Sequence, residues 1–352
     1  MSHHSRSVVS RFGWLAGLLP VWCLGCAPQP AETPAATPAI VTPASPKTAA
    51  TLRKVKLLLN WFPEAEHGGF YAAQVHGYYQ AAGVDVEIIP GGPNIQVVQQ
   101  VATKQVEFAI ANADPICFGR AQQAPVVALM APLQTSPRCL MVHKKSGIKK
   151  FSDIHDMTVA MSATSAFSHF LQKKFAFQNV QVVPYPGNVA QFLQTEDFAQ
   201  QGYVFSEPFL ARQQGGDPHV LMVSDEGFNP YTSCLITHDD LVQNDPDLAR
   251  QVVQASIKGW QQYLAEPEQT NAFIHSLNSE MSLDALAFGV QELKPLVEDA
   301  VTRAQGIGHM GLERWQTLVD QLVEIGQLPP DKVKTSDLFT TQFLKSTEKQ
   351  LP

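Results

Sequence analysis

Short apolar stretches alternate with helix-like stretches along residues 54–130, and this alternation restricts the possible folds more than any other feature of the sequence. Val84, Val86 and Ile88 alternate with two acidic residues, as in a strand with one buried face. The other predicted strands are 54–61, 106–111 and 125–130, with predicted helices over 69–82, 95–101 and 115–123. Strands that alternate with helices predict a mostly parallel sheet with right-handed crossovers.

A second set of alternating segments begins near residue 141. Its predicted strands are 158–161, 180–185, 203–206 and 219–223, with a helix over 165–177. Two similar runs bracket this set, "PRCLMVH" at 137–143 and "YTSCLITH" at 231–238. We expect these runs to be neighbouring strands that cross between two lobes, which would bring Cys139 and Cys234 close together.

The sequence therefore predicts an α/β protein of two lobes joined by a two-segment hinge. The first lobe combines 53–138 with 235–352, and the second is 139–234. The helices predicted to complete the first lobe are 246–264, 267–277, 282–303 with an interruption near Pro295, and 311–325. Two lobes on such a hinge can close around a ligand.

The N-terminal segment is typical of an export signal rather than of a folded element. Residues 1–26 carry two arginines and no acid, and an apolar stretch ends at Gly25-Cys26. We interpret 1–26 as a lipoprotein signal peptide, with Cys26 as the lipidated first residue of the mature protein. Residues 27–52, rich in Pro, Ala and Thr, predict a semi-extended tether. The expected location is the periplasm or cell envelope, attached through the lipid; simple cleavage or an uncleaved anchor are the alternatives.

Composition excludes several classes of function. The net charge is −7 and lysine and arginine are not clustered, so nucleic acid is not an expected partner. The cysteines fit no zinc pattern, and there is no phosphate-binding loop or dinucleotide fingerprint. Ser162, His169 and Asp153 could compose a hydrolase triad, but nothing resembles a nucleophile elbow. We therefore expect a protein that is not an enzyme and needs no metal or cofactor.

The candidate binding residues follow predicted strands. Ligands of open α/β sheets bind outside the carboxyl ends of the strands, so loops at those ends are the natural site. The residues selected on this basis are Asn60, Trp61, His67, Gly69, Asn112, Asp114, Ser162, Thr164, Glu207 and Tyr231.

Each of these positions has a structural alternative. Trp61 offers a platform for a planar ring or fills the core of the lobe. His67 lines the ligand site beside Gly69, where glycines let backbone N–H groups approach a ligand, or it only begins a helix. Asn112 and Asp114 are equally suited to capping a helix. Glu207 either accepts hydrogen bonds from a ring or compensates a helix dipole. Tyr231, on the return crossing, is a candidate to close the site.

The stretch at 59–88, "LNWFPEAEHGGFYAAQVHGYYQAAGVDVEI", resembles the start of thiamine-pyrimidine-precursor-type solute-binding proteins, the SsuA/THI5-like family. The resemblance continues at "SGIKKFSDI", "GYVFSEPFLARQQG", "DPDLARQVVQASIKGWQQYL" and "DLFTTQFL". It covers residues 53–345 and implies a type II periplasmic-binding-protein fold. It also implies a small-molecule solute and an ABC permease in the inner membrane as partners, and we expect a monomer.

The resemblance does not decide which class of solute the protein binds. A flat heterocycle is expected, with a thiamine pyrimidine precursor first and a riboflavin-like flavin second. Sulfonates, taurine or nitrate are the alternative, although Glu207 and Asp114 would repel an anion. A different class is the yeast-type pyrimidine synthase, which uses pyridoxal phosphate and iron. The chain lacks the cysteine-rich iron segment of those enzymes and carries an export signal, so we expect transport rather than synthesis.

Overall fold

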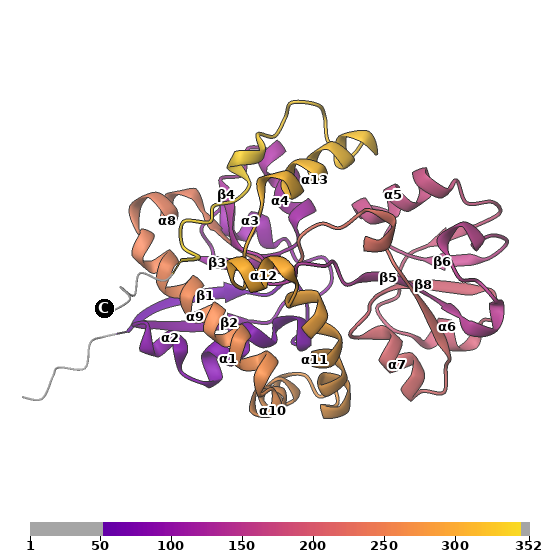
Figure 1. Ribbon diagram of the computed structural model, residues 1–352, viewed down its shortest axis with the longest axis horizontal. Helices are drawn as coiled ribbons and strands as arrows, with labels where there is room; N and C mark the ends of the chain where they lie inside the picture. Colours follow the sequence, from indigo (N-terminus) through magenta and orange to yellow (C-terminus); the bar gives the residue numbers. More distant parts are fainter. Residues whose placement is uncertain (1–51, 346–352) are drawn as a thin grey trace, which may run out of the picture. The chain divides into compact units, whose positions relative to one another are not determined.

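The computed structural model describes residues 52–345, which contain two five-stranded sheets within one compact unit of the chain (Figure 1). The predicted signal peptide, Cys26 and the tether up to residue 51 lie outside these residues.

The first sheet has the strand order β2-β1-β3-β10-β4. Its strands are β1 (Arg53–Leu58), β2 (Val84–Ile89), β3 (Phe108–Ala111), β4 (Val126–Met130) and β10 (Cys234–His238). β1 pairs in parallel with both β2 and β3, whereas β10 is antiparallel to β3 and β4 and separates them. The sheet is therefore mixed, because the chain returns from the second lobe to complete it.

The second sheet has the strand order β7-β6-β8-β5-β9. Its strands are β5 (Arg138–His143), β6 (Thr158–Ala160), β7 (Gln181–Val183), β8 (Phe198–Tyr203) and β9 (Pro218–Met222), and its helices are α5 (Ala166–Phe175), α6 (Ala190–Gln194) and α7 (Glu207–Gln213). β6 is parallel to β7 and β8, and β5 is antiparallel to β8 and β9. The start of β5 therefore lies beside the carboxyl end of β8, where Arg138 is opposite Tyr203.

Helices from both ends of the chain pack around the first sheet. They are α1 (Gly68–Val75), α2 (Tyr78–Ala81), α3 (Val97–Ala102), α4 (Ala113–Ala121), α8 (Asp239–Asn244), α9 (Pro246–Ala265), α10 (Glu268–Leu277), α11 (Leu283–Val297), α12 (Ala300–Gln305) and α13 (Leu312–Glu324). The predicted helix over 69–82 is two helices, α1 and α2. Gly77 lies between them with a φ of 72°, which is incompatible with a continuous α-helix. The interruption predicted near Pro295 in 282–303 is found slightly later, because α11 continues through Pro295 to Val297 and α12 begins at Ala300.

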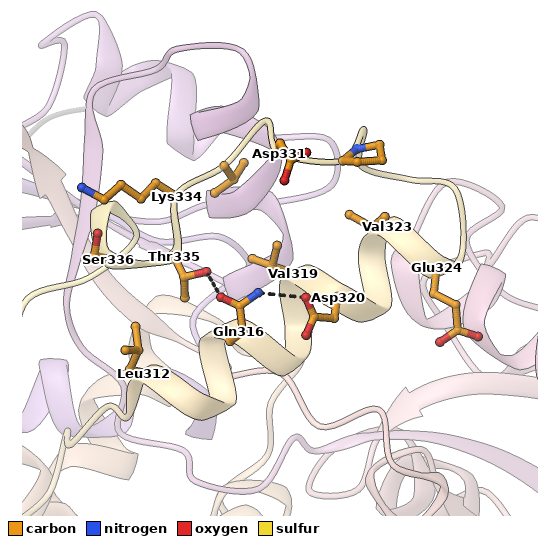
Figure 2. Close-up of a pocket in the computed structure, with 12 residues that line it drawn as sticks. Leu312, Gln316, Val319, Asp320, Val323, Glu324, Asp331, Lys334, Thr335 and Ser336 are labelled. Carbon is orange, nitrogen blue, oxygen red and sulfur yellow. Dashed lines mark hydrogen bonds between the residues drawn. The ribbon is translucent and has the colours of Figure 1, made fainter.

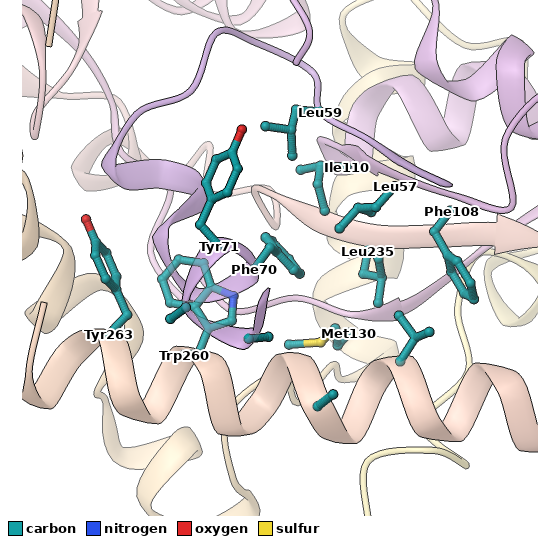
Figure 3. Close-up of a cluster of buried hydrophobic side chains, with 14 of the residues drawn as sticks. Leu57, Leu59, Phe70, Tyr71, Phe108, Ile110, Met130, Leu235, Trp260 and Tyr263 are labelled. Carbon is teal, nitrogen blue, oxygen red and sulfur yellow. The ribbon is translucent and has the colours of Figure 1, made fainter. Parts of the chain in front are cut away.

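Contact between α1 and α9 forms the centre of the first lobe. Trp260 and Tyr263 of α9 lie in one buried cluster with Phe70 and Tyr71 of α1 (Figure 3). The rings of Phe70 and Trp260 meet edge to face with centroids 5.8 Å apart. Gly259 lets the helices approach, since a Cβ there would lie 2.1 Å from the carbonyl oxygen of Gly69.

Two crossing segments connect the lobes, and α13 holds both of them. The outgoing crossing, 131–137, and the return crossing, 223–233, meet at a bridge between Leu133 and Thr232. Arg314 of α13 donates to the carbonyl oxygens of Asn229, at 2.9 Å, and Pro230, at 3.3 Å, and to that of Gln134. One guanidinium therefore ties both crossings to the same helix.

The strands that follow these crossings are not neighbours, so that prediction was wrong. β5, with Cys139, lies in the second sheet, and β10, with Cys234, lies in the first. The crossings approach each other before the cysteines are reached, and then diverge into separate sheets. Cys117, Cys139 and Cys234 are all free and buried.

Candidate functional site

Polar side chains from both lobes meet where β1, β3 and β8 end. We call these residues the interlobe cluster: Asn60, Glu64, Glu66, His67, Asn112, Asp114, Arg138, Tyr185, Tyr203, Ser206, Glu207 and Ser233. Within the cluster, two hydrogen bonds join side chains of the first lobe to side chains that follow or end β8. Asn112 donates to the hydroxyl of Tyr203 at 3.0 Å, and Ser206 donates to Glu64 at 3.3 Å. The cluster is therefore formed by both lobes together.

The segment after β1 contributes a chain of hydrogen bonds. His67 is fully buried, and its Nε2 lies 2.9 Å from the side-chain oxygen of Asn60. Asn60 donates to Glu66 at 3.3 Å, and Ser233 donates to the same Glu66 oxygen at 2.6 Å. Burial lowers the pKa of His67 below its usual range, so the ring is neutral at pH 7. His67 therefore belongs to the cluster through its hydrogen bond to Asn60.

Gly69 lies behind this segment and faces helix α9. A Cβ at Gly69 would lie 2.2 Å from the Trp260 ring, and one at Gly68 would lie 1.9 Å from Tyr263. The two glycines are therefore required by helix packing, which supplies a reason other than approach to a ligand. The predicted role of Gly69 in a ligand site has no support from these contacts.

Trp61 and Phe62 lie on the solvent side of the same segment. Trp61 is half-buried and belongs to neither large core cluster, while Phe62 is 46% exposed. Their rings meet edge to face with centroids 5.4 Å apart. Trp61 is thus not part of the packed core, and its side chain is partly exposed.

Asn112 precedes α4 but does not cap it through its side chain. Its amide nitrogen reaches Tyr203, and its oxygen accepts from the backbone N–H of Ser233 at 3.3 Å. Asp114 lies in the first turn of α4, and burial raises its pKa to about 6. The side chain of Asn112 therefore connects the lobes rather than capping α4.

Glu207 begins α7, and its carboxylate is already bonded within the second lobe. It accepts from the hydroxyl of Tyr185 at 2.6 Å and from the backbone N–H of Tyr203 at 2.7 Å. Each carboxylate oxygen accepts two hydrogen bonds, so each retains capacity for a ligand donor. Glu207 is half-buried at the start of α7.

Three predicted residues lie apart from these contacts. Ser162 and Thr164 follow β6, with their hydroxyls 3.4 Å apart, and the N–H of Ser162 donates to Gln201. Tyr231 is buried against α13, where Arg314 lies 3.9 Å above its ring and its hydroxyl accepts from Gly311. Tyr231 therefore supports the hinge, and the expectation that it closes the site is not supported.

Sequence reasoning missed Glu64, Glu66, Arg138, Tyr185 and Tyr203. Glu64 and Glu66 are 6% and 1% exposed, although acidic residues are rarely this buried. Burial raises the pKa of Glu64 well above its usual range, and the nearby carboxylates of Glu66 and Glu207 raise it further. The acid-rich "EAEH" run between a strand and a helix was the available signal.

The raised pKa of Glu64 predicts a pH-dependent stability. Because the folded protein binds this proton more tightly than the unfolded chain, the stabilisation is complete below the ordinary carboxyl pKa and is lost as pH rises through the raised value. Glu64→Gln should therefore gain in melting temperature relative to wild type as pH rises from about 5 to 8. Thermal melts across this range, with exposed Glu280→Gln as control, test it; a difference independent of pH would refute it.

A separate pocket lies away from the cluster. It has a volume of about 710 Å³ and lies between α13 and residues 330–336 (Figure 2). Gln316 accepts from Thr335 and donates to Asp320 along its edge. It shares no residue with the interlobe cluster. Within residues 52–345, no helix is long and apolar enough to cross a membrane, and no group of metal-ligating side chains is present.

Comparisons with known proteins agree with this arrangement. The family model described as NMT1/THI5 like matches residues 64–270. The chain is 26% identical over 339 residues to the riboflavin-binding protein RibY of Chloroflexus aurantiacus, covering 90% of this chain and 93% of that protein. It is 18% identical to the formylaminopyrimidine-binding protein of Halalkalibacterium halodurans, covering 77% and 85%.

A solved structure shows the same fold. The periplasmic aliphatic sulphonate-binding protein SsuA of Escherichia coli superposes with a TM-score of 0.64 at 15% identity, covering 85% of this chain and 97% of that one. This likeness confirms the two-lobe, type II periplasmic-binding-protein fold that the sequence predicted.

Proposed function

This chain belongs to the NMT1/THI5-like family and is a two-lobe solute-binding protein, and on that premise we propose that it captures a planar, nitrogen-rich heterocycle by lobe closure. In this proposal it delivers the solute to an ABC permease from the periplasmic side of the inner membrane. A relative named as riboflavin-binding and another named as formylaminopyrimidine-binding support a heterocycle as the solute class.

The observation that carries the proposal is the charge balance of the interlobe cluster. Glu66, Glu207 and Asp114 contribute carboxylates, and Arg138 is the single arginine or lysine of the cluster. A sulfonate or nitrate would be repelled by this excess of carboxylates, whereas ring N–H and amino groups would be attracted. The sulfonate alternative is therefore disfavoured by the residues themselves.

Two residues are proposed to hold the ring from opposite lobes. Trp61 would stack on its face, and Glu207 would accept from its N–H or amino donors. Asn60, Asn112 and Asp114 are further proposed contacts. A hydrogen bond to a charged group contributes ~1.5–3 kcal/mol, so Glu207→Gln should weaken binding about tenfold or more. Trp61→Ala should weaken it at least as much, because it removes apolar area as well as stacking.

The test combines a solute screen with titration of variants. A thermal-shift screen of flavins, thiamine pyrimidines and sulfonates selects a solute, and calorimetry then compares wild type, Trp61→Ala and Glu207→Gln. Glu196→Gln, an exposed acid of the same lobe, is the matched control. Wild-type affinity in Glu207→Gln would show that this acid only orders β8 and α7. A much lower melting temperature in Trp61→Ala without ligand would show that the tryptophan stabilises the fold.

The different-class candidate is a pyrimidine-synthesising enzyme. Incubation of purified protein with pyridoxal phosphate and iron, followed by analysis for a pyrimidine product, distinguishes it from a binding protein. Product formed at the expense of pyridoxal phosphate would replace the transport proposal, and reversible solute binding without product would support it.

We also propose that Cys26 is lipidated and that the chain is held at the membrane by this anchor. The apolar stretch ending at Gly25-Cys26 and the six prolines in residues 27–51 motivate this proposal. Cys26→Ser should move the protein from the membrane fraction to the soluble periplasmic fraction. Fractionation of cells that express each form measures this, and unchanged membrane association would exclude the anchor.

A further inference from the structure

Arg138 begins β5, directly after the outgoing crossing, and lies inside the interlobe cluster. Its guanidinium carbon lies 4.1 Å from the ring centroid of Tyr203 and 4.9 Å from that of Phe167. Tyr203 is the residue whose hydroxyl accepts from Asn112 of the first lobe. Arg138 is thus held against the ring that makes a direct contact between lobes.

The guanidinium has stacking partners but no acceptor. Within residues 52–345, the side chain of Arg138 makes no hydrogen bond or ion pair, whereas its backbone N–H donates to Ser136 and its carbonyl oxygen accepts from Val223. Five N–H donors in a planar fork are therefore available at a half-buried position. Its nitrogens are not among the buried, unpaired donors of residues 52–345, so they are open to solvent and available to an acceptor from outside the chain.

The neighbouring charges limit what that acceptor can be. Burial acts to lower the pKa of Arg138, but nearby Tyr203, Glu207 and Asp114 together raise it above its usual range. The positive charge is therefore already compensated by carboxylates that do not themselves bond to it. An anionic ligand group would add repulsion from both acids, whereas a neutral carbonyl oxygen would satisfy the fork without adding charge.

We propose that Arg138 selects the solute by donating to carbonyl oxygens of a neutral ring, so that the site prefers heterocycles with a lactam edge. Such an edge places N–H donors beside carbonyl acceptors. Glu207 would accept from the donors while Arg138 binds the acceptors, since both side chains contact Tyr203. This inference rests on the proposed function, because it specifies which heterocycle that site takes.

Four probes and three variants test this selectivity. Riboflavin and lumichrome share the carbonyl-bearing ring, but lumichrome lacks the ribityl chain. The aminopyrimidine of thiamine has no carbonyl, and ethanesulfonate supplies an anion. Wild type should bind riboflavin and lumichrome more tightly than either other probe. Arg138→Met should bind both flavin-type rings about tenfold more weakly or worse, because it loses hydrogen bonds from a charged donor.

Arg250→Met is the matched control, since Arg250 also lies over an aromatic ring, Phe343, but on α9. It should bind all probes like wild type. Arg138→Lys keeps the positive charge but loses the planar fork of donors. It should therefore bind riboflavin and lumichrome more weakly than wild type while remaining folded. If Arg138→Met has a melting temperature far below that of wild type, its weaker binding could come from misfolding. The affinities of Arg138→Lys for the two rings then test the inference.

Each contrary outcome has a separate meaning. Equal binding of lumichrome by wild type and both Arg138 variants would overturn the inference. So would weakening for riboflavin alone, since that would assign Arg138 to the ribityl chain. Tighter wild-type binding of the aminopyrimidine than of lumichrome would overturn the inference and leave the proposed function intact. Binding of ethanesulfonate with no heterocycle bound would overturn both.

Discussion

Gly259→Ala is expected to lower the melting temperature of the protein by roughly 6–12 °C, through a loss of about 3 kcal/mol or more in the free energy of unfolding. The added Cβ would lie 2.1 Å from the carbonyl oxygen of Gly69 and 2.6 Å from the backbone nitrogen of Ala73. Both are backbone atoms, so no side-chain rotation can relieve the contact. Helices α1 and α9 would have to move apart across the most buried part of the first lobe.

Calorimetric or circular-dichroism melts of Gly259→Ala measure this loss. Gly92→Ala is the control, because its new Cβ would find its nearest neighbour at 3.4 Å, on the Phe62 ring. A melting temperature for Gly259→Ala within about 2 °C of wild type would show that the two helices can separate at low cost. Binding should also weaken in Gly259→Ala, because α1 directly follows the segment that carries Glu66 and His67.

Arg314→Met is expected to cost about 3 kcal/mol in the free energy of unfolding, because a charged donor is removed from several hydrogen bonds at once. The guanidinium donates to the carbonyls of Gln134, Asn229 and Pro230, and it lies over the Tyr231 ring. Its loss leaves the acceptors on both crossings without their shared partner. Hydrogen exchange of the backbone amides of 131–137 and 223–233 should therefore accelerate more than exchange in either sheet.

Thermal melts and hydrogen exchange monitored by mass spectrometry measure these two effects. Arg303→Met is the control, since Arg303 is exposed on α12 and makes a single long contact with Glu298. The free energy of unfolding of Arg303→Met should stay within about 0.5 kcal/mol of that of wild type. If Arg314→Met exchanges faster throughout the protein instead of at the crossings, Arg314 stabilises the whole first lobe rather than the hinge.

The alternation of strands and helices was sufficient to predict most elements, but not the order and direction in which strands pair within each sheet. β2, α9 and α10 lie within one residue or so of their predicted limits because their apolar patterns and helix signals are regular. β8 was misplaced, since it buries Gln200 and Gln201 and so lacks an apolar alternation. The antiparallel insertion of β10 depends on contacts across more than one hundred residues, which no local pattern records.

Candidate site residues that directly follow a strand were found, whereas those that begin or end a strand were missed. Asn60 and Asn112 were selected by position, and both belong to the interlobe cluster. Arg138 begins a strand and Tyr203 ends one, so an argument from loops passed over both. Tyr231 was selected for its place on the crossing, but the direction of its side chain depends on α13, far later in the sequence.

The insertion of β10 between β3 and β4 also fixes the order in which this chain can acquire its structure. β4 pairs with β10 alone among the strands of its sheet, and the whole second sheet is synthesised between them. A chain leaving a ribosome or a translocation channel N-terminus first therefore completes its second sheet while β4 still has exposed, unpaired backbone groups. Unpaired strand edges promote association with other chains, so β4 is where a chaperone would have most to protect. One edge of β4 stays unpaired until residue 238 emerges, and the other until residues 338–340 pair with Ala128.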